Sequence, residues 1–379
     1  MLAKDGLAVA GGRFVDVGVG GLLLGGGVNH FGSQVGWAAD QVLSFEIVLA
    51  SGQVLSQVTR TSQHADLFWA LQGGLNNFGI VTEITVRTFS VAPGSVYGGL
   101  LIYNDTEFES FVDAVAHYAS PGPGPTGGGM ADSASAIEPV IAFVPATGTT
   151  AGGTLIFHHY HQQGNRSSDD NDDDMTPPPS LANFTAIKAQ ESTVAVWNSF
   201  AEFAMLTAAP GFGSYDFRQL YHTVTVKASS PKAVKLVKDV FQPLAMAPEG
   251  SPLREIAGFT TTLNPQPISE AWLRASKASG GNALGLDPDV DGPLVLIGLS
   301  SFWLHEADDK AVFDFHVVAI EAITEATKEA GLWHPFVYLN DGHPSQKPFE
   351  TYGRGTSLPR LQAVSKKYGK NHPSPAFHS

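Results

Sequence analysis

The pattern of hydrophobic and polar residues is densest near the start of the chain. QVLSFEIVLASGQVLSQVT holds two runs rich in β-branched residues on either side of Ala50-Ser51-Gly52. Because glycine adopts the positive φ that tight turns require, this stretch predicts a β-hairpin. SQHADLFWALQGG, which follows, predicts a short helix capped by Ser62 and ended by Gly73. NNFGIVTEITVRTFSV then predicts another strand.

Beyond Val91, strands and helices alternate at longer intervals. The expected strands are 96–102, 139–144, 154–161, 222–227, 256–263 and 294–301. The expected helices are 108–118, 231–244, 306–330 and a final amphipathic helix in SLPRLQAVSKKYG. In the helix 306–330, apolar residues recur at helical spacing and form one apolar face. This part of the chain therefore predicts a sheet covered by helices.

Two segments interrupt this pattern. PGPGPTGGG, which begins at Pro121, is typical of a flexible or extended linker. Its glycines have the spacing of a dinucleotide-binding turn, but the intervening prolines exclude the helix that must follow, which disfavours a nicotinamide enzyme. RSSDDNDDDMTPPPS predicts an acidic surface loop, with a calcium site as the alternative.

Composition narrows the class of protein. The 379 residues are enough for two domains, and 43% hydrophobic with 15% charged residues is typical of a soluble globular protein. No apolar run approaches the roughly 20 residues of a membrane helix. With 36 acidic and 22 basic residues, the net charge of −14 disfavours nucleic acid and anionic membranes as partners. Because there is no cysteine, any redox chemistry must use a cofactor.

Generic catalytic motifs give little support to other enzyme classes. The sequence has no GxSxG, HExxH or GxxxxGK motif, which argues against hydrolases, zinc proteases and NTPases of those types. FHHYHQ places His159 and His161 on one side of a strand, a spacing that could bind zinc. Since no third ligand is evident, a polar strand face is favoured and no metal is expected.

A run of three glycines has a sharper interpretation. In GGLLLGGGVNHFGSQVGWAADQV, Gly25, Gly26 and Gly27 lack a Cβ, so their main-chain N–H groups can approach a large planar or phosphate-bearing ligand closely. The alternative is a tight, strained turn inside a β-domain. The run alone does not decide between the two.

The order of the motifs supplies further information. GGxxLGGGxxxFG, GxAADQV, FEIVLASGQV, DLFWALQGG and NFGIVTE follow one another along the chain. This succession resembles the second half of the PCMH-type FAD-binding domain of the vanillyl-alcohol-oxidase type, and in particular the berberine-bridge-enzyme-like flavoproteins. The tail, with Tyr338-Leu339-Asn340-Asp341, Gln346 and Tyr352-Gly353, is similar to the fungal variant of the family's C-terminal segment.

The resemblance implies an α+β fold. It divides the chain into the second half of the FAD-binding domain at 1–92, an inserted substrate domain of antiparallel sheet covered by helices at 93–332, and a C-terminal segment at 333–379 that returns to the FAD domain. It implies an FAD-dependent oxidoreductase of secondary metabolism. This enzyme would oxidise a hydroxyl or amine of a small metabolite or sugar by hydride transfer to flavin N5. Dioxygen would be the acceptor, and a monomer is expected.

The resemblance also implies site residues. The residues implied to line the flavin are Gly25, Gly26, Gly27, Asn29 and His30. Those implied to border the ribityl and pyrophosphate region are Gly36, Ala39 and Asp40. Those implied to meet the adenine end are Gly79, Ile80 and Val81. Asn340 would approach the isoalloxazine, and the candidate catalytic residues are Asp341 and Tyr338.

The sequence also departs from the family. Members begin with a half-domain that contains an RGGGH-like loop and usually the histidine bonded to the flavin, so this chain is expected to be N-terminally truncated. The alternative is a non-catalytic remnant that binds no FAD. Many plant relatives have tyrosine where this chain has Asp341. The compartment is left open, with secretion expected only if a signal peptide precedes the chain; the sequons at Asn104, Asn165 and Asn183 would matter only then.

Overall fold

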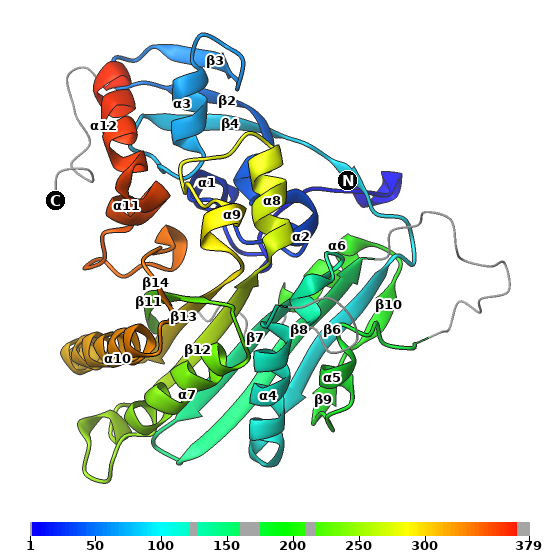
Figure 1. Cartoon of the computed structure of the whole chain (residues 1–379), viewed down its shortest axis with the longest axis vertical. Helices are drawn as coiled ribbons and strands as arrows, with labels where there is room; N and C mark the ends of the chain where they lie inside the picture. The colour runs from blue at the N-terminus through cyan, green and yellow to red at the C-terminus, as the bar shows by residue number, and fades with distance from the viewer. Residues whose placement is uncertain (1, 122–127, 160–174, 209–216, 370–379) are drawn as a thin grey trace, which may run out of the picture.

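The computed structural model describes residues 2–121, 128–159, 175–208 and 217–369. These residues form two lobes, and each lobe is built on an antiparallel sheet (Figure 1). Most of the linker that begins at Pro121, most of the acidic tract, and His161 lie outside the described residues. The α+β class expected from the sequence is confirmed.

The first lobe, called here the small lobe, contains a three-stranded sheet in the order β3-β2-β4. The predicted hairpin is confirmed, since Val48 pairs with Val54 and Gly52 has a φ of 80°. The predicted cap is wrong: helix α3 begins at Ala65, and the Ser62 hydroxyl accepts the N–H of His64 in the turn before it. The bounds are β2 Val42–Val48, β3 Val54–Val58, α3 Ala65–Leu71 and β4 Ile80–Val86.

The second lobe, the large lobe, is a sheet of nine strands among the described residues. Its order is β10-β6-β8-β7-β12-β13-β11-β14, with β9 also paired to β6. The bounds are β6 Val96–Tyr103, β7 Ser135–Val144, β8 Thr149–His159, β9 Glu191–Ser192, β10 Ala195–Trp197, β11 Arg218–Lys227, β12 Thr260–Ile268, β13 Leu294–Trp303 and β14 Trp333–His334. Each long strand expected from the sequence is present, but the one expected at 256–263 begins later, at Thr260, and runs to Ile268.

Three helices cover one face of the large sheet (Figure 1). They are α4 Phe108–Tyr118, α7 Lys232–Ala245 and α10 Asp309–Glu329, close to the predicted ranges. Because side chains alternate along a strand, the other face carries a different set. On β8, Ile156 faces the helices, whereas Leu155 and Phe157 pack with Phe31 of the small lobe. The two lobes therefore meet across the face opposite the helices.

One part of the range expected for the substrate domain packs on the small lobe instead. Helices α8 (Glu270–Ala278) and α9 (Pro288–Asp291), with the loop between them, follow β12. Their Trp272, Leu273 and Leu284 belong to the same hydrophobic core as Trp37 and Phe45. Sequence analysis did not anticipate this return of the chain.

The C-terminal segment runs back onto the small lobe, as Figure 1 shows. Its helices are α11 Pro348–Thr351 and α12 Ser357–Tyr368, and Leu361 packs in the small-lobe core. The remaining helices and strands are β1 Leu7–Ala8, α1 Val19–Leu24, α2 Gly32–Val35, β5 Phe89–Ser90, α5 Ala182–Thr185 and α6 Phe200–Ala204. Short 3-10 turns are η1 Leu2–Asp5, η2 Ala38–Gln41, η3 Asp105–Glu107, η4 Gly129–Ala131, η5 Met205–Ala208, η6 Pro252–Arg254, η7 Glu306–Asp308, η8 Leu339–Asp341 and η9 Tyr352–Gly355. No helix in the described ranges is both long and apolar enough to span a membrane.

Three buried histidines connect the sheet, a covering helix and the C-terminal segment. The rings of His222 on β11 and His343 stack with centroids 4.3 Å apart, and His316 on α10 stacks on His222 at 6.0 Å. Burial, followed by the neighbouring imidazoles, lowers the pKa of His316 to about 2 and that of His222 to about 3. The cluster is therefore neutral near pH 7. No group of described residues is arranged to hold a metal ion.

We expect the substitution His316→Gln to reduce the loss of stability on acidification. The folded-state pKa lies below the unfolded value, so the unfolded chain binds more protons and the free energy of unfolding falls as the pH drops below about 6.5. For one such histidine, the loss between pH 7 and pH 5 is about 2 kcal/mol. Urea unfolding at the two pH values measures it. His305→Gln, at an exposed position, is the control, and equal losses in all three proteins would contradict the prediction.

Candidate functional site

The glycine run forms a turn that meets the C-terminal segment. The main-chain N–H groups of Gly27 and Val28 both donate to the Tyr338 hydroxyl, at 3.0 and 3.3 Å. The side-chain amide of Asn340 donates to the same hydroxyl at 3.1 Å. Residues 25–28 and 338–340 are therefore joined by hydrogen bonds, and we call them together the glycine corner.

Close packing within the chain explains the glycines of this corner. Gly26 and Gly27 have φ values of 122° and 88°, which other residues rarely adopt. A Cβ on Gly27 would lie 2.7 Å from the Cβ of Ala38, and a Cβ on Gly25 would overlap the Asn340 amide. The absent side chains thus make room for other parts of the same chain. Of the three N–H groups expected to face a ligand, that of Gly27 donates to Tyr338 and that of Gly25 donates to the Gly21 carbonyl.

Hydrogen bonds that involve Asn29, Gly36 and Ala39 stabilise the glycine corner. The Asn29 amide donates to the carbonyls of Gly27, at 3.3 Å, and Gly36, at 3.0 Å. The Ala39 N–H donates to the Gly26 carbonyl at 2.8 Å. The structure therefore brings these predicted residues together with the glycine run, and their direct contacts support its shape.

Asp40, which follows Ala39, is also buried. Its carboxylate accepts hydrogen bonds from the Trp37 N–H at 2.9 Å and from the Asn282 amide at 2.8 Å. Burial raises the pKa of Asp40 to about 6, against the lowering effect of these hydrogen bonds. A Cβ on Gly36 would lie 2.5 Å from this carboxylate. Asp40 thus caps a turn of the small lobe.

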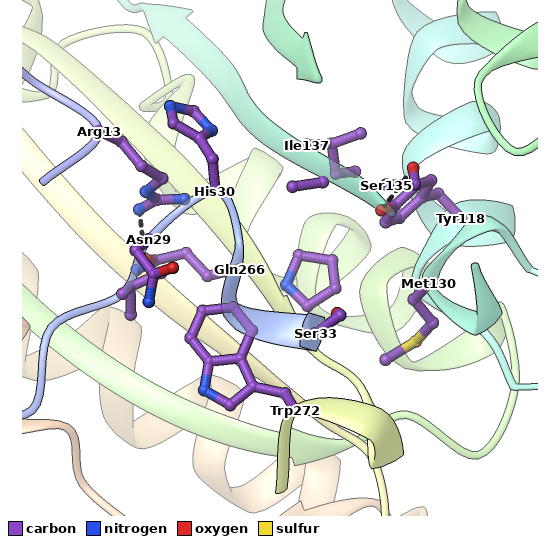
Figure 2. Close-up of a pocket in the computed structure, with 13 residues that line it drawn as sticks. Arg13, Asn29, His30, Ser33, Tyr118, Met130, Ser135, Ile137, Gln266 and Trp272 are labelled. Atoms are coloured by element: carbon purple, nitrogen blue, oxygen red, sulfur yellow. Dashed lines mark hydrogen bonds between the residues drawn. The ribbon is translucent and has the colours of Figure 1, made fainter. Parts of the chain in front are cut away.

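A small pocket lies between the two lobes, and Figure 2 shows the residues that surround it. Its volume is about 20 Å³, enough for one water molecule. The polar residues that line it include Arg13, Asn29 and Ser33 of the small lobe and Ser135 and Gln266 of the large sheet. We call it the interlobe pocket.

His30 borders the interlobe pocket with a buried ring. The ring lies against Phe157 and Phe203, with centroids 5.1 and 5.3 Å away, and is 5% exposed. Burial, followed by the charge of Arg13, lowers the pKa of His30 to about 3, so the imidazole is neutral. Within the described residues its Nε2 atom has no hydrogen-bond partner. His30 can therefore offer one nitrogen to a molecule in the pocket.

A chain of polar contacts leads from this pocket to Asp341. The Arg13 guanidinium donates to Gln266 Oε1 at 2.5 Å, and Gln266 Nε2 donates to Asp341 Oδ2 at 2.6 Å. Arg13 Nε also lies 3.3 Å from Glu138 Oε1. Burial raises the pKa of the Asp341 carboxyl, although Gln266 and Arg13 act in the opposite direction. No sequence motif marks Arg13, Glu138 or Gln266, so the sequence did not predict them.

A larger cleft lies along the edge strand β4 of the small lobe. Its volume is about 760 Å³, and Gly79, Ile80 and Val81 line it together with Val19 and Leu24. Ile80 is 72% exposed and Val19 is 63% exposed, so apolar side chains form part of the rim of the cleft. The structure thus places the residues predicted for the adenine end in a cleft with an apolar rim, apart from the interlobe pocket.

The described residues fit a large, flat, partly apolar ligand such as FAD. The cleft has the size of common cofactor sites, roughly 300–1,000 Å³, and a Cβ on its residue Gly20 would meet no atom within 4 Å. Leu24 lines the cleft and Val28 lines the interlobe pocket, so the glycine corner connects the two. In the described part of the chain, Trp272 Nε1 beside the pocket is also without a hydrogen-bond partner.

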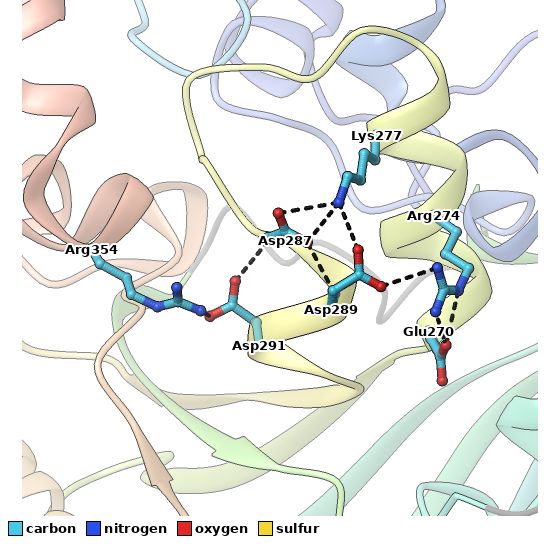
Figure 3. Close-up of polar contacts among 7 residues, drawn as sticks. All are labelled: Glu270, Arg274, Lys277, Asp287, Asp289, Asp291 and Arg354. Atoms are coloured by element: carbon cyan, nitrogen blue, oxygen red, sulfur yellow. Dashed lines mark hydrogen bonds and ion pairs between the residues drawn. The ribbon is translucent and has the colours of Figure 1, made fainter.

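The buried carboxylate of Asp291 pairs with Arg354 of the C-terminal segment (Figure 3), the segment that also carries Tyr338 and Asp341. Asp291, at the end of α9, is 7% exposed. Its Oδ1 accepts from His334 Nε2 at 2.9 Å and from the Arg354 guanidinium at 2.6 Å. Burial alone would raise the pKa of Asp291, but hydrogen bonds from His334, the Asp287 N–H and Arg354 lower it. One carboxylate thus connects two points of the C-terminal segment to the small lobe.

We expect Asp291→Asn to lower the free energy of unfolding by about 1.5–3 kcal/mol, the usual contribution of hydrogen bonds to a charged group. The folded-state pKa is lowered, so this contribution is present above the unfolded pKa of about 3.9 and is lost as the pH falls through the folded value. Urea unfolding at pH 7 and pH 3 measures both effects. Asp314→Asn, in a surface pair with Lys310, is the control, and an equal effect there would contradict the prediction.

Comparison with known proteins identifies relatives over nearly the whole chain. The FAD-dependent monooxygenase prx3 of Penicillium roqueforti is 36% identical over 372 residues, which cover 97% of this chain and 67% of that protein. The bifunctional solanapyrone synthase of Alternaria solani is 30% identical over 364 residues, 96% of this chain and 62% of that protein. The chain thus spans about two thirds of the length of these relatives. No model of a protein family matches it.

Solved structures show the same fold. The 6-hydroxy-D-nicotine oxidase of Arthrobacter nicotinovorans has a TM-score of 0.65 at 21% identity, over 97% of this chain and 72% of that one. The glucooligosaccharide oxidase of Acremonium strictum has a TM-score of 0.66 at 18% identity, with the same coverage. Taken with the identity to prx3, these findings show that the chain belongs to the FAD-linked oxidoreductases and has the fold of vanillyl-alcohol-oxidase-type and berberine-bridge-enzyme-like proteins.

Proposed function

We propose that the protein oxidises a hydroxyl or amine of a small metabolite or sugar between the two lobes, beside the interlobe pocket, by hydride transfer to flavin N5. The observation that supports this proposal is the chain of contacts from Arg13 through Gln266 to Asp341, which connects the pocket to a carboxylate of raised pKa. The names of relatives support the class of reaction, since they describe FAD-dependent monooxygenases and a glucooligosaccharide oxidase.

The proposed position of FAD extends from the cleft to the interlobe pocket. The residues that would hold the adenine end are Gly79, Ile80 and Val81 in the cleft. The glycine corner, with Asn29, His30 and Asn340, would lie near the flavin ring; Gly36, Ala39 and Asp40 would support this corner from behind. When bound, FAD would supply a hydride acceptor at N5. Dioxygen would then accept the two electrons from the reduced flavin.

Asp341 is the proposed general base. Its carboxylate is half-buried and receives a hydrogen bond on Oδ2 from Gln266. A carboxylate of raised pKa accepts a proton more readily near neutral pH, as a catalytic base must. It would take the proton from the substrate hydroxyl or amine while the adjacent C–H bond breaks.

Tyr338, the second candidate, is better suited to a structural role. Its hydroxyl accepts hydrogen bonds from Gly27, Val28 and Asn340, and burial raises its pKa further above the usual value. A phenol of raised pKa stays protonated at neutral pH and is a poor base. We propose that Tyr338 maintains the shape of the glycine corner.

The test is retention and reduction of FAD by the purified 379-residue chain. The protein is desalted after incubation with FAD, and the flavin absorption that remains with it is measured. Retained flavin should then lose its absorption without oxygen when a panel of alcohols, amines and oligosaccharides is added. Failure to retain FAD would favour the second candidate, a flavin-free remnant. That candidate has one supporting observation: Tyr338 already occupies two N–H groups of the glycine corner.

A further inference from the structure

We propose that Glu138 is a positioning residue for this site: it holds the Arg13 guanidinium away from the Asp341 carboxylate, so that Asp341 stays available to accept a proton. The proposal rests on the assignment of Asp341 as the base. It concerns three side chains that no motif marks, Glu138, Arg13 and Gln266, which come from separate parts of the chain.

The strand pattern places Glu138 and Gln266 on the same side of the large sheet. On β7, Ile137 belongs to the core under the helices, so its neighbour Glu138 points to the opposite face. On β12, Leu263 belongs to that core, and Gln266, three residues later, also points to the opposite face. Both side chains therefore face the small lobe, where Arg13 contacts them. Figure 2 shows Arg13 beside Gln266.

The chemistry of Arg13 determines which atoms donate and which accept in the contacts with Gln266 and Asp341. Arg13 can only donate, so Gln266 must present its carbonyl oxygen to Arg13 and its NH₂ group to Asp341. Glu138 Oε1 takes the Nε side of the same guanidinium, at 3.3 Å. Glu138 thus fixes Arg13, Arg13 fixes the orientation of Gln266, and Gln266 is left as the side chain that contacts the Asp341 carboxylate.

The other charged or titratable groups near these carboxyls do not replace Arg13. Tyr221 and Tyr338 face Asp341, and both have a raised pKa, so they stay neutral. His30 faces Arg13 and is neutral for the reason given above. Among the described residues, Arg13 is therefore the cation that acts on both carboxylates, and Glu138 and Asp341 compete for it.

The burial of Glu138 favours this role over a simple stabilising ion pair. Glu138 is 8% exposed, and its Oε2 atom has no partner within the described residues. Burial raises the pKa of Glu138, while Arg13 lowers it and Asp341 raises it again. A buried carboxylate with one unpaired oxygen is costly. If Glu138 lost its charge, Asp341 would remain as a buried carboxylate on which the charge of Arg13 acts.

The experiment isolates the titration of Asp341 in the purified 379-residue chain, without substrate. Free energies of unfolding in urea are measured from pH 4 to pH 8 for the wild type, Glu138→Gln, Arg13→Met and Glu191→Gln, each with and without Asp341→Asn. The difference between each protein and its Asp341→Asn counterpart gives the contribution of Asp341. Because the folded-state pKa of Asp341 is raised, this contribution is present at low pH and is lost as the pH rises through the folded value.

In the Glu138→Gln background, this loss should end at a pH lower by about 1 unit or more, the usual effect of a close opposite charge on an aspartate. Arg13→Met should raise the pH at which the loss of the Asp341 contribution ends. Glu191→Gln, at an exposed position on β9, is the matched control and should leave it unchanged. An identical Asp341 contribution in the wild type and in Glu138→Gln would overturn the proposal. If Glu138→Gln does not fold, the absence of an upward shift in Arg13→Met would overturn it.

A second measurement connects the inference to turnover. The substrate is the panel compound that reduces the flavin fastest. The acidic limb of the plot of kcat/KM against pH should move to lower pH in Glu138→Gln, with little change in KM. An unshifted limb would overturn the proposal. Absence of any turnover would contradict the proposed function, whereas the stability measurements would still decide whether Glu138 and Asp341 compete for Arg13.

Discussion

Replacing Trp37 with alanine is expected to lower the free energy of unfolding by about 3–5 kcal/mol, as for other buried tryptophans. Trp37 is 1% exposed. Its ring centroid lies 5.5 Å from that of Trp272 on α8 and 5.4 Å from that of Tyr338. The substitution would leave a cavity where three distant parts of the chain meet behind the glycine corner. Urea unfolding of the two proteins at pH 7 measures the loss.

The matched control for this prediction is Trp69→Ala. Trp69 is a half-buried residue of α3, and the Arg360 guanidinium lies 3.7 Å from the centroid of its ring. Because less of the ring is removed from water, the loss of stability should be less than half of that at Trp37. Equal losses at the two positions would show that Trp37 does not have the central packing role described here.

The second large effect is expected at Asp341. Asp341→Asn keeps the shape of the side chain and an oxygen that can accept the hydrogen bond from Gln266, but it removes the base. General bases contribute about 10²–10⁴-fold to rate. We therefore expect kcat/KM to fall by that factor, while FAD retention stays unchanged. Anaerobic reduction of the flavin by the active panel compound gives the rate, and desalting with FAD gives retention.

Asp308→Asn serves as the control for the same chemical change, because Asp308 lies in the turn before α10 and lines neither the interlobe pocket nor the cleft. It should react at the wild-type rate. A full rate in Asp341→Asn, with FAD bound, would remove Asp341 from the mechanism. Loss of FAD in that variant would instead indicate that Asp341 acts on the binding of the cofactor.

Local sequence signals predicted the separate elements well. The hairpin around Gly52 and helix α4 at 108–118 lie where they were expected, because turn glycines and helical spacing of apolar residues act over short distances. Ser62 shows the limit of such signals. A serine before an apolar run predicts a cap, but here its hydroxyl accepts the N–H of His64 in the preceding turn and α3 begins later.

Interactions between distant residues account for what the sequence did not predict. Helices α8 and α9 pack on the small lobe because Trp272 and Leu284 complete its core, and no local pattern shows which core an apolar residue joins. The same holds for the polar chain of Arg13, Glu138 and Gln266. These residues are ordinary in their own neighbourhoods, and only the pairing of the lobes brings them together.

The sequence by itself determined the class of fold, the elements and the family, since motifs such as GGxxLGGGxxxFG depend on residues close together in the chain. The sequence also identified the glycine run, but not the side chains that pack against it. The tertiary structure decided that Tyr338 and Asn340 fill the space left by the glycines, and that Gln266 and Arg13 connect Asp341 to the interlobe pocket. The physical reason is that the hydrogen bonding and burial of a side chain depend on neighbours that are hundreds of residues away, and those neighbours are set only when the two lobes and the C-terminal segment pack together.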